Sequence, residues 1–148
     1  MKVAISKLNW VAAIGLIVCL NAISDARAQS GGSIKLNKDA VAFASQLIRE
    51  GYLIADGKGA WHEHKPSPVE ENEFIRAHGF AEYSKWHLGV DERYAVNTKR
   101  RYKFPYGDFA NVHRCGLLAV KARAGQHKYH DIEDAATRLI GMTRRARW

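Results

Sequence analysis

The chain is poor in cysteine, with two among its 148 residues, Cys19 and Cys115. Cys19 lies in an N-terminal segment that we expect to be removed, so the mature chain cannot form an internal disulfide. The domain must then be held by its apolar core alone, which a chain of this size can build. The remaining Cys115 indicates a buried inert thiol, an intermolecular bridge or a reactive nucleophile.

The sequence also lacks an apolar run long enough to span a membrane. Its N-terminal apolar stretch, residues 10–20, is about half the roughly 20 residues that a transmembrane helix needs. Lys2 and Lys7 precede it and an Ala-Arg-Ala tripeptide follows, which is the order of a secretory signal peptide. We predict a signal peptide over residues 1–28, cleavage after Ala28 and a periplasmic or secreted protein with no transmembrane segment. Retention of the segment as an anchor is the alternative.

Motifs of the common enzyme classes are absent as well. The chain has no G-x-S-x-G, no H-E-x-x-H, no P-loop and no dinucleotide fingerprint. Glu70, Glu71 and Glu73 could be paired for glycoside chemistry, but they lie at a predicted helix start, where the helix dipole favours negative charge. We therefore assign no catalytic residue and expect no cofactor.

Apolar residues at helical spacing are the strongest signal that the sequence does contain. Residues 38–50 carry one apolar stripe between Asn37, a capping residue, and the stop Gly51. This pattern predicts the first helix of the domain. After it, Asp56-Gly57 predicts a short β-hairpin or an ordered loop over residues 52–61.

A second helix start follows this loop. Ser67, Pro68 and Glu70 form a capping box with proline at the first helical position. The helix is predicted to end at Gly79, and residues 80–88 to form a short third helix.

The C-terminal half predicts two longer helices. Asp108 would cap a strongly apolar helix over residues 108–124, in which Gly116 allows a close approach of another helix. Asp131 would cap the last helix, which carries a clean apolar stripe. The sequence thus predicts an all-α fold of four or five helices that ends in an antiparallel helical hairpin.

The predicted organisation is one helical domain. After the signal peptide we expect a flexible leader over residues 29–36, the domain over 37–142 and a basic tail over 143–148. Residues 90–106 show no apolar stripe and are predicted to be a basic, aromatic linker inside the domain.

Asp108, His113 and Cys115 lie within eight residues of one another, which raises the question of a thiol-hydrolase centre. On a continuous helix, His113 and Cys115 point about 200° apart and cannot be hydrogen-bond partners. Asp108 would be occupied as the helix cap. We therefore expect a core histidine and an inert core thiol, while a reactive thiol or a dimer bridge stays open.

His62 and His64 are the best candidates for metal ligands. In an extended chain, residues two apart share a face, so both imidazoles could bind one ion. A stable site needs three or four ligands, and the sequence identifies no partner for these two. The alternative is a polar loop.

A basic segment with interleaved aromatic rings suggests binding of a polyanion. The candidate residues lie in the linker and in the C-terminal tail: Lys99, Arg100, Arg101, Tyr102, Lys103, Arg144, Arg145 and Arg147. The alternative is a solvated linker whose aromatic rings hold it against the core.

Residues 83–142 resemble an uncharacterised bacterial module that is also seen in phage-encoded proteins. The similarity lies in short motifs: Trp86 and Leu88, Thr98-Lys99, residues 104–108 (F-P-x-G-D), 112–114 (V-H-R), 123–126 (R-A-x-Q) and 132–136 (I-x-x-A-A). The resemblance implies a helical hairpin docked by an aromatic linker. It implies no established activity, and no catalytic residue is carried over from it.

Charge and export together suggest a function. The net charge of +8 falls to +6 when Lys2, Lys7, Arg27 and Asp25 leave with the signal peptide. We expect a non-enzymatic binding protein for an anionic envelope polymer, a lipid headgroup or a protein, and not for nucleic acid. The alternative is a small metal- or thiol-dependent hydrolase that uses His62, His64 or Cys115. The sequence does not set the oligomeric state.

Overall fold

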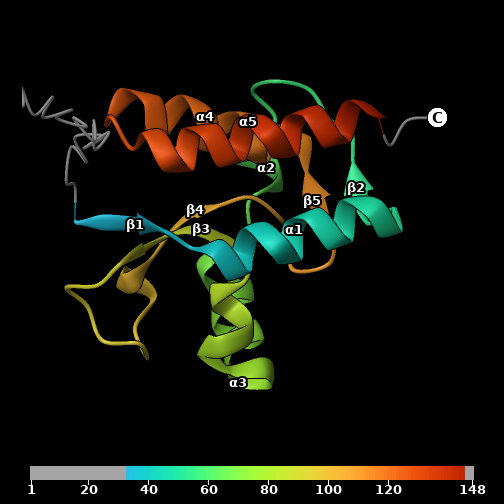
Figure 1. Cartoon of the computed structure of the whole chain (residues 1–148). Helices are drawn as coiled ribbons and strands as arrows, with labels where there is room; N and C mark the ends of the chain where they lie inside the picture. Colours follow the sequence, from blue (N-terminus) through green and yellow to red (C-terminus); the bar gives the residue numbers. More distant parts are fainter. Residues whose placement is uncertain (1–32, 146–148) are drawn as a thin grey trace, which may run out of the picture.

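Figure 1 shows the chain as a computed structural model, which describes residues 33–145. The predicted signal peptide and the tail residue Arg147 lie outside the described residues. The elements follow in the order β1 (Ile34–Leu36), α1 (Lys38–Glu50), β2 (Leu53–Ile54), α2 (Trp61–His64), α3 (Pro68–Ser84), β3 (His87–Asp91), the 3-10 turn η1 (Lys99–Arg101), β4 (Tyr102–Pro105), β5 (Val112–His113), α4 (Arg114–Gln126) and α5 (His130–Arg145).

The fold is mixed α/β, so the prediction of an all-α protein is wrong. An antiparallel sheet has the strand order β1-β3-β4, and a second, parallel pair joins β2 to β5. Most of these strands have two to four residues, too few for the alternation by which a strand is recognised in a sequence. The longest, β3, is buried at four of its five positions and therefore does not alternate either.

Several predicted segments change with this correction. Residues 34–36, predicted to belong to a flexible leader, form β1 and pair with β3. Residues 90–106 are not a plain linker, because they contain the end of β3, then η1 and β4. The predicted third helix stops at Ser84, where β3 soon follows. Residues 52–61 form no hairpin, since β2 pairs in parallel with the distant β5 and α2 begins at Trp61.

The predicted starts of the first two helices are confirmed. The Asn37 side chain accepts a hydrogen bond from the backbone of Ala40, and Gly51 ends α1 in the left-handed region at φ 88°. In α3, the hydroxyl of Ser67 accepts from the backbone of Glu70 at 3.3 Å, and the Glu70 carboxylate accepts from the Ser67 amide at 2.7 Å. Gly79, at φ 80°, breaks the helical backbone where the sequence places the end of the second helix.

The predicted C-terminal hairpin is also confirmed. Helices α4 and α5 lie side by side along one side of the molecule, and α5 contacts α1, β1 and β3 (Figure 1). The apolar stripe of the last helix is fully buried: Ile132, Ala135, Ala136, Leu139 and Ile140. Between residues 33 and 145, no helix combines the length and the hydropathy that crossing a bilayer requires.

The predicted helix over residues 108–124 is wrong in its first turns, because α4 begins only at Arg114. The carboxylate of Asp108 accepts hydrogen bonds from the amides of Ala110 and Asn111 at 2.9 and 2.6 Å, which closes a local turn in place of a helix. Phe109 takes φ 70°, a value that no right-handed helix allows. The chain then enters β5, so His113 is a strand residue and not a helix residue.

Candidate metal centre

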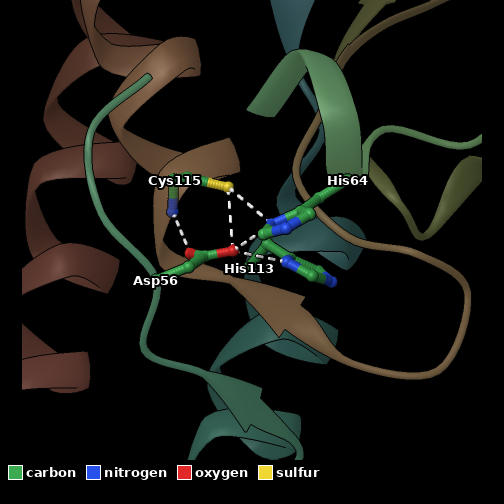
Figure 2. Close-up of side chains that lie close together, drawn as sticks. All are labelled: Asp56, His64, His113 and Cys115. Carbon is green, nitrogen blue, oxygen red and sulfur yellow. Dashed lines mark hydrogen bonds and ion pairs between the residues drawn. The ribbon is translucent and has the colours of Figure 1, made fainter. Parts of the chain in front are cut away.

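Four side chains with metal-ligand atoms converge beneath α2. Figure 2 shows Asp56, His64, His113 and Cys115 pointing toward one another, and one ligand atom from each lies within 4.8 Å of the other three. Histidine nitrogen, cysteine sulfur and carboxylate oxygen are the ligand types that zinc-binding proteins use. Among residues 33–145, this is the one group of three or more histidine, cysteine or acidic side chains that lie close enough together to hold a metal ion.

Two stretches far apart in the sequence, residues 56–64 and 113–115, supply these side chains. Asp56 lies two residues after the end of β2, and His64 is the last residue of α2. His113 ends β5, and Cys115 is the second residue of α4. The parallel pairing of β2 with β5 places Ile54 opposite His113, which brings the loop carrying Asp56 to the start of α4.

Asp56 is at the centre of the group. Its Oδ2 atom lies 2.7 Å from Nδ1 of His64, 2.7 Å from Nδ1 of His113 and 3.0 Å from Sγ of Cys115. Its Oδ1 atom accepts a hydrogen bond from the Cys115 amide at 2.6 Å and so caps the N-terminus of α4 from outside the helix. One carboxylate thus ties the loop to the helix and gathers three further polar groups around one oxygen.

Burial and charge determine how these groups ionise. Burial raises the pKa of Asp56, but hydrogen bonds from the Cys115 thiol and amide and from both histidines outweigh it and hold that pKa well below its ordinary value. The Cys115 residue is 1% exposed. Burial, together with the hydrogen bond to Asp56 and its negative charge, raises the pKa of the Cys115 thiol to about 12. Without a metal ion, the sulfur is therefore a protonated thiol that donates to Asp56.

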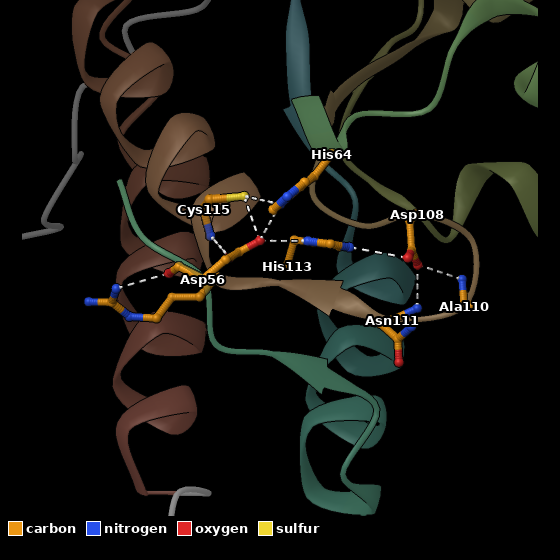
Figure 3. A network of polar contacts seen from close by, with 8 residues as sticks. Asp56, His64, Asp108, Ala110, Asn111, His113 and Cys115 are labelled. Atoms are coloured by element: carbon orange, nitrogen blue, oxygen red, sulfur yellow. Dashed lines mark hydrogen bonds and ion pairs between the residues drawn. The ribbon is translucent and has the colours of Figure 1, made fainter. Parts of the chain in front are cut away.

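A second carboxylate supports His113 from the opposite side of its ring. Figure 3 shows the ring between Asp56 and Asp108, with Nε2 3.1 Å from Oδ2 of Asp108. This Nε2 atom is buried, and no described residue gives it a hydrogen bond of good geometry. Metal-bound histidines commonly donate their second ring N–H to a carboxylate, which orients the ring and strengthens the ligand. Asp108 occupies that position.

The distances between these ligand atoms can be compared with those expected around a tetrahedrally coordinated metal ion. At metal–ligand distances of about 2.0–2.3 Å, neighbouring ligand atoms lie about 3.3–3.6 Å apart. Sγ of Cys115 lies 3.7 Å from Nδ1 of His64, close to this range, whereas Oδ2 of Asp56 lies closer to its neighbours. The four ligand atoms could therefore surround such an ion once Asp56 moves outward and any pair as far apart as 4.8 Å moves closer together.

The structure separates the two histidines that the sequence grouped. His62 is not in the group, because residues 61–64 form a helix and not the extended chain on which a shared face depended. Its side chain is 77% exposed, and its Nδ1 contacts the Gly59 carbonyl. His64 turns inward to the Asp56 carboxylate and is 36% exposed.

Cys115 and His113 also differ from the expectation of isolated core residues. Both are buried as predicted, but both touch Asp56, which the sequence analysis treated only as a turn residue. The predicted angle of about 200° between them does not apply, because His113 precedes the helix. The one signal that could have found this pair is the His-x-Cys spacing at a strand-to-helix junction, where both side chains can share a face.

The basic residues of the predicted polyanion site are largely engaged within the chain. Lys99 forms an ion pair with Glu71 at 2.9 Å, and Arg101 donates to the carbonyl of Tyr94 at 2.8 Å. The hydroxyl of Tyr102 donates to the carbonyl of Val96. These contacts hold residues 94–102 in a compact turn.

The other candidates of that site are dispersed. Arg100 and Lys103 lie over the ring of Tyr94, at 5.7 and 5.6 Å from its centroid. Arg144 and Arg145 are exposed at the end of α5, and Arg147 lies outside the described residues. Among the described members of this set, Lys103 is the one that also lines a cleft.

No family model, curated protein or solved structure matches this chain. The similarity of residues 83–142 to a bacterial module therefore stays a prediction. The candidate site has to be interpreted from its own geometry.

Proposed function

We propose that this protein binds one divalent transition-metal ion, with Zn²⁺ as the best fit, through Asp56, His64, His113 and Cys115. The observation that supports this most directly is the convergence of four ligand atoms within 4.8 Å. A buried thiol, a carboxylate and two imidazoles are costly to collect without an ion that satisfies them together.

The role that this geometry favours is structural. Four protein ligands complete a tetrahedral zinc site, whereas catalytic sites keep one position for water or substrate. Three of the four side chains are nearly buried: Asp56 is 9% exposed, His113 7% and Cys115 1%. A bound ion would fasten the loop after β2 and helix α2 to the start of α4.

A thiol hydrolase receives less support from the same site. A nucleophilic cysteine must be available as a thiolate. Here burial and Asp56 raise the pKa of the Cys115 thiol to about 12, so the nucleophile would be the minor form by several orders of magnitude at neutral pH. The thiol is better suited to lose its proton to a metal ion than to attack a substrate.

Metal titration tests the proposal. We expect the purified protein, stripped with a chelator, to bind one equivalent of Zn²⁺ in isothermal titration calorimetry. With Co²⁺ as the probe, we expect tetrahedral d–d bands and a thiolate-to-cobalt charge-transfer band that disappears in Cys115→Ser. His64→Ala should weaken Zn²⁺ binding by about a hundredfold, because it removes one ligand of four.

His62→Ala is the matched control, since His62 lies two residues away on the same short helix and outside the group. It should bind Zn²⁺ as the unaltered protein does. Equal losses in His62→Ala and His64→Ala, or a Co²⁺ spectrum without a sulfur band, would contradict this assignment.

A further inference from the structure

A cleft of about 590 Å³ opens on the side of the three-stranded sheet next to α4. This volume is within the range of small-molecule sites. Residues from β1, α2, β3, β4 and α4 and the loop before α5 line it, and none of the four proposed metal ligands is among them. The cleft is therefore a separate feature, although Trp61 of α2 lines it three residues before His64.

The walls of the cleft are aromatic. Trp61, Tyr94, Phe104 and Tyr129 contribute rings, and the rings of Phe104 and Tyr129 meet edge to face at 5.8 Å. Phe104 takes φ 63°, an unfavourable conformation for a bulky residue, which the surrounding structure maintains. Gly89 makes room for this ring, because a Cβ at that position would lie 2.7 Å from Cδ2 of Phe104.

The charged groups of the cleft are mostly positive. Its one acidic residue, Asp91, is 1% exposed and already paired with Arg93, at 2.9 Å to Nε and 2.8 Å to Nη2. Lys103 and Arg123 also line the cleft, and no carboxylate pairs with either among the described residues. Neither cation is thus held in an ion pair beside the aromatic wall, although Lys103 also lies over the ring of Tyr94 and its charge acts on Asp91.

We propose that this cleft binds a small aromatic anion, such as an arene carboxylate or sulfonate. The ring of the ligand would pack against Phe104 and Tyr129, and its anionic group would pair with Lys103 and Arg123. A planar ring and a single charge match what the cleft offers, whereas a long polymer would bind along the surface and make little use of the aromatic wall. The sequence predicted anion binding by a basic segment, whereas this proposal assigns anion binding to one cleft. The proposal does not depend on a bound metal ion.

Calorimetry with 2-naphthoate as the probe tests the proposal. We expect saturable one-to-one binding, with and without a chelator. Lys103→Gln and Arg123→Gln should each weaken it by about fivefold, since each removes one partly exposed ion pair. 2-Naphthylmethanol, which keeps the rings without the charge, and cyclohexanecarboxylate, which keeps the charge without the aromatic ring, should both bind more weakly.

Lys121→Gln is the matched control, because Lys121 is an exposed residue of the same helix as Arg123 and does not line the cleft. It should bind 2-naphthoate as the unaltered protein does. An equal loss in Lys121→Gln would show general charge attraction and overturn the proposal. Absence of 2-naphthoate binding would also overturn it, as would a heparin-derived tetrasaccharide that alone binds and alone depends on Lys103 and Arg123.

Discussion

Asp56 uses its two carboxylate oxygens for different tasks. Oδ1 caps the first turn of α4 through the Cys115 amide, and Oδ2 faces both histidines and the Cys115 thiol. The cap fixes the orientation of the carboxylate, so Oδ2 is held where the other three groups meet. A helix N-terminus usually lowers the pKa of a nearby thiol, but here the Asp56 charge and burial have the opposite effect.

His87 is a buried titratable residue that lies away from the candidate site. It is 3% exposed, its Nδ1 donates to the Tyr83 carbonyl at 2.9 Å, and its ring faces those of Tyr83 and Tyr102. Burial lowers its pKa from 6.5 to about 4, although the hydrogen bond to Tyr83 and the charge of Glu71 act in the other direction. The folded protein therefore keeps this histidine neutral.

This shift predicts acid sensitivity. The unfolded chain binds a proton at His87 below about pH 6.5 and the folded chain only near pH 4, so stability is lost as the pH falls between these values. The loss due to this residue should approach about 3 kcal/mol. His87→Asn keeps a donor for the Tyr83 carbonyl and cannot ionise in this range, so its free energy of unfolding should fall less with acid.

Urea unfolding of the unaltered protein and of His87→Asn at pH 7.5 and pH 4.5 measures this difference in stability, with a chelator present in all samples. The two proteins share all other histidines, so the difference between them isolates His87. An equal pH dependence in both would show that His87 is protonated in the folded state.

For single residues, the sequence indicated which side chains could belong to a site better than it indicated which side chains they contact. It named His64, with His62, as a possible metal ligand and left open a reactive thiol at Cys115; His64 and Cys115 both lie in the candidate site. It assigned Asp108 to a helix cap, because the apolar run after this residue is compatible with a helix, although its partner His113 is near in the sequence. It assigned Asp56 to a turn, because the contacts that define the role of this residue join positions 59 apart. Local patterns carry no information about such contacts.

Among the elements, α2 and α4 approach each other unusually closely at Gly116. A Cβ on this residue would lie 2.8 Å from the Tyr106 carbonyl oxygen and 3.0 Å from Cε3 and Cζ3 of Trp61. The sequence predicted a close helix approach here, and the partner is the short α2 that carries His64. The position of His64, a proposed metal ligand, thus depends on the absence of a side chain at residue 116.

Gly116→Ala should therefore displace α2. We expect an increase in Kd for Zn²⁺ of about tenfold and a loss of about 1–3 kcal/mol in the free energy of unfolding, since the added methyl meets backbone on one side and a ring on the other. Calorimetry and urea unfolding measure the two effects. Gly141→Ala in α5, where a Cβ meets nothing within 4 Å, is the control and should be neutral or slightly stabilising. Unchanged Zn²⁺ binding in Gly116→Ala would count against a coupling of α2 to the site.

Helices could be predicted where a cap or an apolar stripe marked them: α1 has both, α3 has the capping box, and α5 has the stripe, although its predicted cap Asp131 lies inside the helix. Strands could not, because β2 and β5 have two residues each and are specified by their partner and not by their own pattern. The start of α4 was missed for a related reason. The turn at Asp108 and the strand pairing of Val112 prevail over an apolar run that is compatible with a helix.

For the whole molecule, removal of the metal should lower stability. A ligand that binds only the folded state stabilises it in proportion to the logarithm of its concentration, by about 4 kcal/mol at 1,000 times Kd. We therefore expect the Tm to rise with added Zn²⁺ and to fall with a chelator, and the Tm of Cys115→Ser to change little with either. Differential scanning fluorimetry over a Zn²⁺ series measures this. A Tm independent of Zn²⁺ would be incompatible with a structural site.

The parallel strands β2 and β5 are neighbours in space but are separated by a long stretch of the chain. The chain between these two strands forms α2, α3, β3 and β4. After it, Cys115 contacts Asp56, which lies 59 positions earlier in the sequence. Contacts at that junction close the chain into a large ring, and a bound ion would help to offset the chain entropy that this closure costs in the folded state. A single backbone cut within the exposed turn near Val96 would then open the ring without releasing either half.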